Sequence, residues 1–208
     1  MEDILQTLYA NLYDSSLIEG IAVFFGILSV WFARKENILV FPTGIISVLL
    51  YVYICIEGKI YADAGINVFY FVMSVFGWYN WTHKSGAVAE REISRTNRKQ
   101  NLLIVLGFAV FFLILYYTLT HFTDSDVPVL DALTTSIFLL GMWLMALKKI
   151  ENWILWIIGD LISIPLYFYK GYVLTSMQFI VFLILAIMGY IEWKQRLEAM
   201  EANSTVSG

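Results

Sequence analysis

The stretch that decides the fold is Glu151–Tyr169, which reads ENWILWIIGDLISIPLYFY. It is apolar along most of its length, and after its first residue only one charged side chain, Asp160, interrupts it. An α-helix needs about 20 mostly apolar residues to cross the hydrocarbon core of a bilayer. The stretch therefore predicts a transmembrane helix that carries a carboxyl group near the centre of the membrane.

The composition of the whole chain agrees with this interpretation. Of the 208 residues, 60% are hydrophobic, 17% aromatic and only 14% charged. A soluble domain is about 45–50% apolar and about 25% charged, so an ordinary soluble enzyme or a nucleic-acid-binding protein is excluded. A disordered chain, which would be poor in aromatic residues, is excluded as well. The single cysteine, Cys55, allows neither an internal disulfide nor a multi-cysteine metal site.

Seven segments of the chain have this length and apolar character, so we expect an all-α membrane protein with seven transmembrane helices. We expect residues 1–16 to form an N-terminal extension, either a short helix on the membrane surface or a frayed tail. A basic cytoplasmic loop covers 82–101, and 194–208 form a cytoplasmic tail. The expected helices are 17–33, 38–56, 62–81, 102–119, 129–147, 152–169 and 172–193.

The distribution of Lys and Arg predicts the orientation in the membrane. Eleven of the 13 basic residues lie at the ends of the first, third, fifth and seventh segments, whereas only Lys59 and Lys170 lie on the other side. Cytoplasmic loops carry the excess of Lys and Arg, so the N-terminus is expected outside and the C-terminus in the cytoplasm. The basic loop 82–101 could suggest a nucleic-acid or lipid patch, but we interpret it as a topology signal and solvated linker. For the chain as a whole we expect the lipid bilayer, and no nucleic acid, as a partner.

The sequence also contains an internal repeat, in which two stretches of the first half resemble two stretches of the second half. ENILVFPTGIISVLLYVY, residues 36–53, is similar to the stretch quoted above, and GWYNW, residues 77–81, is similar to GYIEW, residues 189–193. The offset in residue number is 115 at the start and 112 at the end, with Gly44 matched to Gly159. Residues 17–81 and 129–193 then form two parallel copies of three helices, joined by the linker helix 102–119. Such 3+1+3 repeats occur in secondary transporters, with the substrate near the midplane, although duplication also builds structural bundles.

Polar and aromatic side chains recur at helical spacing on the expected helices, which places them on one face of each. Polar groups inside a membrane need a partner or a cavity, so we predict that these faces line one substrate cavity. Asp160 is either a counter-ion for a cation, an acceptor for sugar hydroxyls, a proton site, or a protonated structural group. The predicted substrate-binding residues are Trp153, Trp156, Asp160, Ser163, Asp63, Asn67, Tyr70 and Gln178.

No Lys or Arg lies within an expected helix, so a phosphorylated substrate would lack a basic partner. The substrate is therefore expected to be neutral or cationic, and aromatic. A retinal photoreceptor would need a lysine within the last helix, where Lys170 and Lys194 only flank it. His83 and His121 lie in loops, and no metal-binding spacing is found. We therefore expect no enzyme activity, no metal and no cofactor.

ENWILWIIGDLIS, with YADAGINVFYFVMSVFGWYNW at 61–81, resembles the Pnu family of vitamin transporters, and the resemblance covers about residues 17–196. It implies a 3+1+3 fold related to SWEET sugar transporters and a homotrimer in a bacterial inner membrane. It also implies uptake of nicotinamide riboside by facilitated diffusion with alternating access, followed by trapping by a kinase.

Thiamine is the alternative substrate within the same family, and proton coupling stays open. Asn152, Trp153 and Trp156 match the family's Asn-Trp-x-x-Trp stretch, which contributes to the substrate site. Asp160 stands where many members have an amide, and an acid at this position would favour a cation.

Overall fold

A computed structural model describes residues 17–83 and 91–206, with side chains as far as Asn203. The described part is helical and contains no sheet, only an isolated bridge between Ser94 and Lys149. Both findings confirm the all-α class. The helices are α2 (Leu17–Arg34), α3 (Val40–Glu57), α4 (Tyr61–Thr82), α5 (Arg98–Phe122), α6 (Pro128–Ala146), α7 (Glu151–Tyr169) and α8 (Val173–Val206).

Six of these described helices are long and apolar enough to cross a membrane, so the expectation of a multi-pass membrane protein is confirmed. The exception is α4, which is long enough but less apolar, since Asp63, Asn67 and Asn80 interrupt it. Residues 1–16 lie outside the described residues, so the expected N-terminal extension is not tested.

Two helix ends differ from the sequence expectation by more than three residues. α5 begins earlier than expected, at Arg98, because Asn97 and Gln100 form a capping box in which each side chain accepts a hydrogen bond from the other's backbone N–H. α8 continues beyond Trp193 to Val206, so most of the expected cytoplasmic tail is helical. The apolar pattern of 172–193 ends at the membrane, but a helix can continue into water when its residues favour it.

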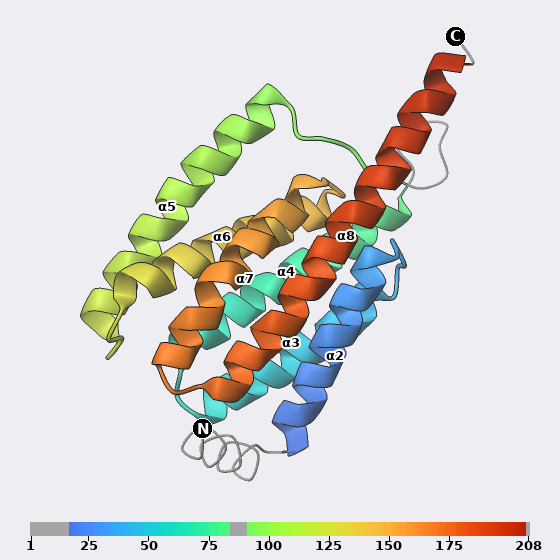
Figure 1. Cartoon of the computed structure of the whole chain (residues 1–208). Helices are drawn as coiled ribbons and strands as arrows, with labels where there is room; N and C mark the ends of the chain where they lie inside the picture. Colours follow the sequence, from blue (N-terminus) through green and yellow to red (C-terminus); the bar gives the residue numbers. More distant parts are fainter. Residues whose placement is uncertain (1–16, 84–90, 207–208) are drawn as a thin grey trace.

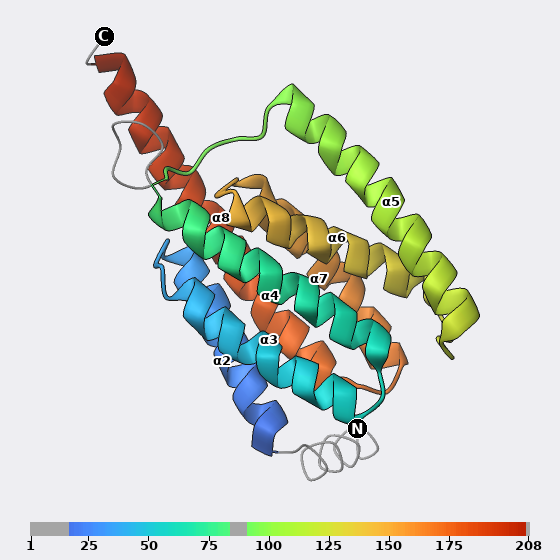
Figure 2. The same cartoon turned by 180° about the vertical axis from the view of Figure 1, so that it is seen from behind.

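Six of the helices form a closed ring, and the seventh stands beside it (Figures 1 and 2). α2, α3 and α4 pack in sequence, and so do α6, α7 and α8. The two groups meet twice, where α4 packs on α6 and where α2 packs on α8. α5 packs along α6, and none of the residues described in it is buried. An apolar helix with so little protein contact is suited to a lipid environment.

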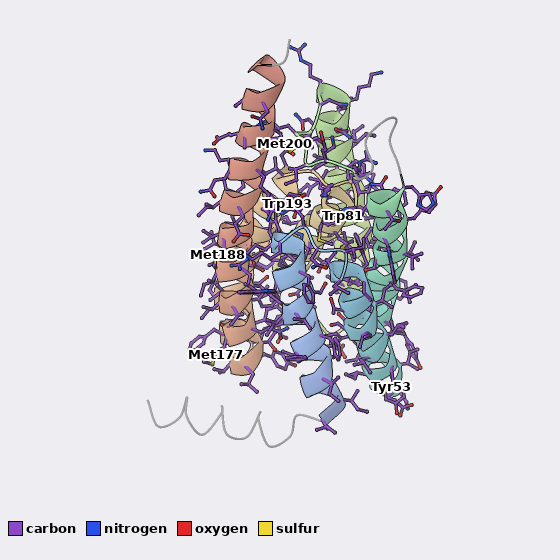
Figure 3. The ribbon with its side chains drawn as sticks, turned by 90° about the vertical axis from the view of Figure 1, so that its right-hand side faces the viewer. Tyr53, Trp81, Met177, Met188, Trp193 and Met200 are labelled. Atoms are coloured by element: carbon purple, nitrogen blue, oxygen red, sulfur yellow. The ribbon has the colours of Figure 1, made fainter. Side chains whose placement is uncertain are left out.

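The core lies at one end of the ring, which we call the inner end: the end at which α2 and α6 finish and α3 and α7 begin (upper end in Figure 1). Trp81, Trp153 and Trp193 are buried there, and the ring centroids of Trp153 and Trp193 lie 5.5 Å apart, edge to face. Figure 3 shows Trp81 and Trp193 at the same level of the bundle. Large buried aromatic residues dominate core energetics, so this end of the ring is tightly closed.

The segment before α5 is fixed to the inner end. Ile93 is buried in the core, and the backbone of Ser94 exchanges hydrogen bonds with Lys148 and Ile150. The Lys149 ammonium donates to the Ser94 hydroxyl at 2.8 Å. Burial and, to a smaller extent, nearby positive charge lower the pKa of the Lys149 amine. The expected basic loop is therefore a strap across the α6–α7 turn in its described part.

Two tryptophan hydrogen bonds join the two groups of helices in the same way. Trp81 in α4 donates its indole N–H to the carbonyl of Met145 in α6, and Trp193 in α8 donates to the carbonyl of Ala33 in α2, both at 3.1 Å. The residue numbers of the two donors differ by 112, and so do those of the two acceptors. The two interfaces between the groups are thus built by matched contacts.

The turns at the inner end follow the same offset. Glu36 and Lys148, whose residue numbers also differ by 112, are both left-handed, with φ of 54° and 56°. The backbone therefore matches at this offset at the start of the two groups as well as at the end. At this offset Gly44 pairs with Trp156, whereas the sequence match at 115 paired it with Gly159.

Candidate functional site

A cavity of about 260 Å³ lies inside the ring, and residues of α2, α3, α4, α6, α7 and α8 line it. α5 contributes none of the described lining residues. The wall from the first group is rich in small and polar side chains, and the wall from the second group is rich in aromatic ones. The polar and aromatic lining residues are Ser29, Ser47, Ser74, Tyr51, Asn67, Tyr70, Asp160, Gln178, Phe41, Phe138, Trp156, Phe179 and Phe182.

Asp160 is the acidic residue of this lining. It lies nine residues after the start of α7, roughly 14 Å along the axis at 1.5 Å per residue, which is the middle of the helix. Its side chain is 1% exposed, and Oδ2 has no hydrogen-bond partner among the described residues. No Lys or Arg occurs among the described residues that line the cavity. Because buried polar groups need partners, this carboxyl group is free to bind a ligand's cation or donor.

The aromatic wall lies next to this carboxyl group. Phe138 in α6 and Phe179 in α8 stack with centroids 5.8 Å apart and planes 14° apart, and Phe182 meets Phe179 edge to face. Trp156, one turn before Asp160 on α7, adds an indole face. Aromatic faces bind flat rings by stacking and attract cations through their quadrupole. This wall suits a flat, positively charged ring.

The opposite wall offers hydrogen-bond acceptors. Ser29 donates its hydroxyl to the carbonyl of Val40 at 2.7 Å, and Ser47 donates to the carbonyl of Ala22 at 2.8 Å. A hydroxyl has one proton and two lone pairs. With the proton used inside the protein, each serine oxygen keeps lone pairs for the hydroxyl or amide donors of a ligand.

With this geometry established, comparison with known proteins identifies the family. The profile of the nicotinamide mononucleotide transporter family matches residues 16–195. The chain belongs to this family. Its members are membrane transporters, in agreement with the expectation that the chain is not an enzyme.

Several curated proteins resemble this family member along most of their length. The nicotinamide riboside transporter PnuC of Escherichia coli K12 is 25% identical over 206 residues, with 87% of this chain and 86% of the relative covered. PnuC of Neisseria mucosa is 28% identical over 189 residues, covering 86% and 72%. The riboflavin/roseoflavin transporter RibM of Streptomyces davaonensis is 20% identical over 187 residues, covering 88% and 87%.

A solved structure has the same fold. The crystal structure of the vitamin B3 transporter PnuC superposes with a TM-score of 0.69 at 25% sequence identity, and the match covers 94% of this chain and 88% of that one. The resemblance to the Pnu family that the sequence motifs indicated is therefore confirmed.

In the structure of the present chain, five of the nine predicted site residues lie together. They come from α4, α7 and α8 and line one cavity, as the stripes on these helices predicted. These five residues are Trp156, Asp160, Asn67, Tyr70 and Gln178.

The other four predicted residues do not line the cavity. Asn152 and Trp153 are fully buried at the inner end, where Asn152 donates to the carbonyl of Lys149 at 2.6 Å. Ser163 is buried, and its hydroxyl has no partner among the described residues. Asp63 is exposed near the start of α4. A helical stripe identifies a face, but the depth of each residue decides whether that face meets core, cavity or solvent.

Sequence reasoning missed several lining residues, chiefly Ser29 and Phe138. Each is inconspicuous in an apolar helix. The sequence carries no signal for Phe138. Its position matches that of Gly26 at the offset of 112, but only the structure shows that Gly26 lines the cavity from α2.

Proposed function

We propose that the chain carries nicotinamide riboside across the membrane by facilitated diffusion. The observation that carries this proposal is the cavity itself, in which the buried, unpartnered Asp160 faces an aromatic wall and no described lining residue is basic. Nicotinamide riboside combines a flat cationic ring with an uncharged sugar. The ring suits the wall of Trp156 and Phe179, and the sugar hydroxyls suit the serine oxygens.

The same cavity argues against the phosphorylated form of this vitamin. A phosphate group carries strong negative charge and is bound by Lys, Arg or helix N-termini. Asp160 would repel it, and no basic side chain among the described lining residues would compensate. We therefore propose that nicotinamide mononucleotide, which appears in the family's description, is not carried, and that a kinase traps the riboside after entry. Thiamine is also cationic and aromatic, but none of the comparisons above favours it.

The transport cycle we propose uses two parallel three-helix repeats, α2–α4 and α6–α8, related by an axis along the membrane normal. Support comes from cavity-lining residues that recur at an offset of 112. These pairs are Gly26 with Phe138, Val30 with Met142, Gly44 with Trp156, Val48 with Asp160, Asn67 with Phe179 and Tyr70 with Phe182. Repeats of this kind rock around a central site in secondary transporters.

The inner end is closed by contacts between the repeats. Lys148 forms an ion pair with Glu36 at 2.9 Å, and the indole hydrogen bonds of Trp81 and Trp193 flank it. In alternating access these contacts break to release substrate inward. We further propose an inner-membrane homotrimer with its C-terminus in the cytoplasm, which rests on the family resemblance and on the distribution of basic residues.

Uptake into proteoliposomes tests this function. We expect saturable uptake of labelled nicotinamide riboside, no uptake of nicotinamide mononucleotide, weaker uptake of thiamine, and no dependence on a pH gradient. Trp156→Ala should greatly reduce uptake, whereas the matched control Trp78→Ala, on the exposed part of α4, should not. Equal uptake of the mononucleotide, or normal uptake by Trp156→Ala, would contradict the proposal.

A further inference from the structure

Trp156 lies directly on the backbone of α6 at Gly141. A Cβ atom built on Gly141 would overlap Cδ1 and Nε1 of the indole ring, so only glycine allows the ring to lie there. The indole N–H is buried and has no hydrogen-bond partner among the described residues. The ring is therefore held in place by shape and not by a polar contact.

The corresponding contact in the first repeat, between α2 and α3, has the glycine on the other helix of the pair. Gly44 corresponds to Trp156 and Ser29 to Gly141, and a Cβ on Gly44 would lie 2.9 Å from the Ser29 hydroxyl oxygen. A second pair of contacts repeats the pattern. The Phe138 ring would overlap a Cβ built on Gly159, whereas at the corresponding positions a Cβ built on Gly26 would lie 3.2 Å from the Ser47 hydroxyl oxygen. Large aromatic rings thus contact the glycines of the second repeat, whereas small serine hydroxyls contact those of the first repeat.

We infer that Gly141 is a positioning residue for the substrate site. By leaving room for the Cδ1–Nε1 edge of the Trp156 indole against α6, it holds the ring at the edge of the cavity and keeps it out of the space beside Gly44 and Gly26, which line the cavity as well. A methyl group at position 141 would push the indole toward this space, because the α6 backbone blocks the other direction. The inference rests on the proposed function only in that Trp156 contacts the substrate.

The prediction concerns substrate affinity more than folding. An added methyl group would overpack the contact between α6 and α7. The side chain that has the cavity beside it can move to relieve this strain, and here that side chain is the Trp156 indole. In Gly141→Ala we expect KM for nicotinamide riboside to rise about tenfold or more, with a smaller change in the maximal rate. Trp156→Phe removes the distal six-membered ring of the indole, so the shorter side chain can shift away from the added methyl group without reaching into the cavity.

A double-mutant cycle in proteoliposomes tests the coupling. Gly141→Ala should raise KM in the natural chain but change it little in the Trp156→Phe background. Gly65→Ala, whose Cβ would meet nothing within 4 Å, is the neutral control. Gly189→Ala presses on Trp153, which does not line the cavity, so it should lower thermal stability and leave KM unchanged.

A readout without substrate separates this inference from the proposed function. With fluorinated tryptophan, the ¹⁹F resonance that disappears in Trp156→Phe belongs to residue 156, and it should shift in Gly141→Ala but not in Gly65→Ala. A shift without any uptake by the natural chain would overturn the function but keep the positioning role. An unmoved resonance, or an equal rise in KM in both backgrounds, would overturn the inference.

Discussion

The ion pair between Glu36 and Lys148 should control how often the inner end opens. Nζ of Lys148 lies 2.9 Å from Oε2 of Glu36, and the side chains of Glu36 and Lys148 are 16% and 6% exposed. The Lys148 ammonium also lies 4.7 Å from the centre of the Trp81 ring. These two residues lie two positions after the ends of α2 and α6, one in each proposed repeat, so the pair exists only while the inner ends are together. Glu36→Gln should therefore destabilise the inward-closed state.

The magnitude follows from the burial of the pair. Removing one partner of a fully buried pair costs about 3–5 kcal/mol, and exposed pairs contribute about 0–1 kcal/mol. This pair lies between these limits, so we expect about 2 kcal/mol, which is roughly a 30-fold increase in the inward-open population. Arg196 also donates to Glu36, at 2.6 Å, but its side chain is 45% exposed and should add little.

Thiol labelling measures this population. In a Cys55→Ser background, Met145→Cys places a thiol in the inner part of the cavity, where a reagent added from the inner side reaches it only after opening. Labelling should be roughly 30-fold faster in Glu36→Gln. Glu198→Gln is the matched control, because its pair with Lys194 spans 3.9 Å between half-exposed side chains.

Exchange of the two charges provides the decisive comparison. Glu36→Lys combined with Lys148→Glu restores the ion pair. Both positions have a left-handed backbone that already holds one Glu and one Lys, so the exchange introduces no new residue type there. The exchanged protein should label slowly again. Equal labelling rates in Glu36→Gln and Glu198→Gln, or no slowing upon exchange, would refute the role of this pair as an inner gate.

Three further outcomes are expected. Asp160→Asn should reduce the uptake of nicotinamide riboside about tenfold or more, and should impair competition by uncharged nucleosides much less, as measured by competition for uptake. Ile93→Ala should lower stability by about 2–4 kcal/mol, seen as a lower melting temperature in detergent, because Ile93 is 2% exposed in the core. Burial lowers the pKa of the Lys149 amine, so the unfolded chain binds this proton more tightly than the folded protein does. The free energy of unfolding should therefore rise with pH between the lowered pKa and the ordinary one. Lys149→Met should flatten this dependence of stability on pH.

Helical periodicity was sufficient to predict the class of fold and part of the site. Trp156 and Asp160 lie four residues apart on α7, and this spacing alone put them on one face. Trp153 has the same periodicity but lies one turn closer to the inner end, where the face meets the Trp193 ring instead of the cavity. Depth along the helix is a property of the packed bundle, which the pattern of a single helix does not contain.

The register that we propose for the repeat was predicted at only one end. GWYNW and GYIEW gave the offset of 112, but Glu-Asn occurs at 36 and again at 151, and this identity suggested 115. The proposed register is supported by the left-handed residues Glu36 and Lys148, and again by Lys59 and Gly171, with φ of 56° and 81°. Three of these four are not glycine, so no residue type marks the turns. Backbone geometry is preserved at these turns where residue identity is not.

The proposed pairing of residues between the two groups of helices explains how a nearly symmetric helix arrangement can bind an asymmetric ligand. In the register that we propose, Val48 pairs with Asp160 and Gly44 with Trp156, yet only the second proposed repeat supplies the carboxyl group and the indole. A ligand with a cationic ring at one end and hydroxyls at the other needs different chemistry on the two walls. Rocking requires only that the two repeats share a backbone, so their side chains are free to differ. In the proposed transport cycle, movement therefore depends on what the two repeats have in common, and the choice of substrate depends on the positions at which they differ.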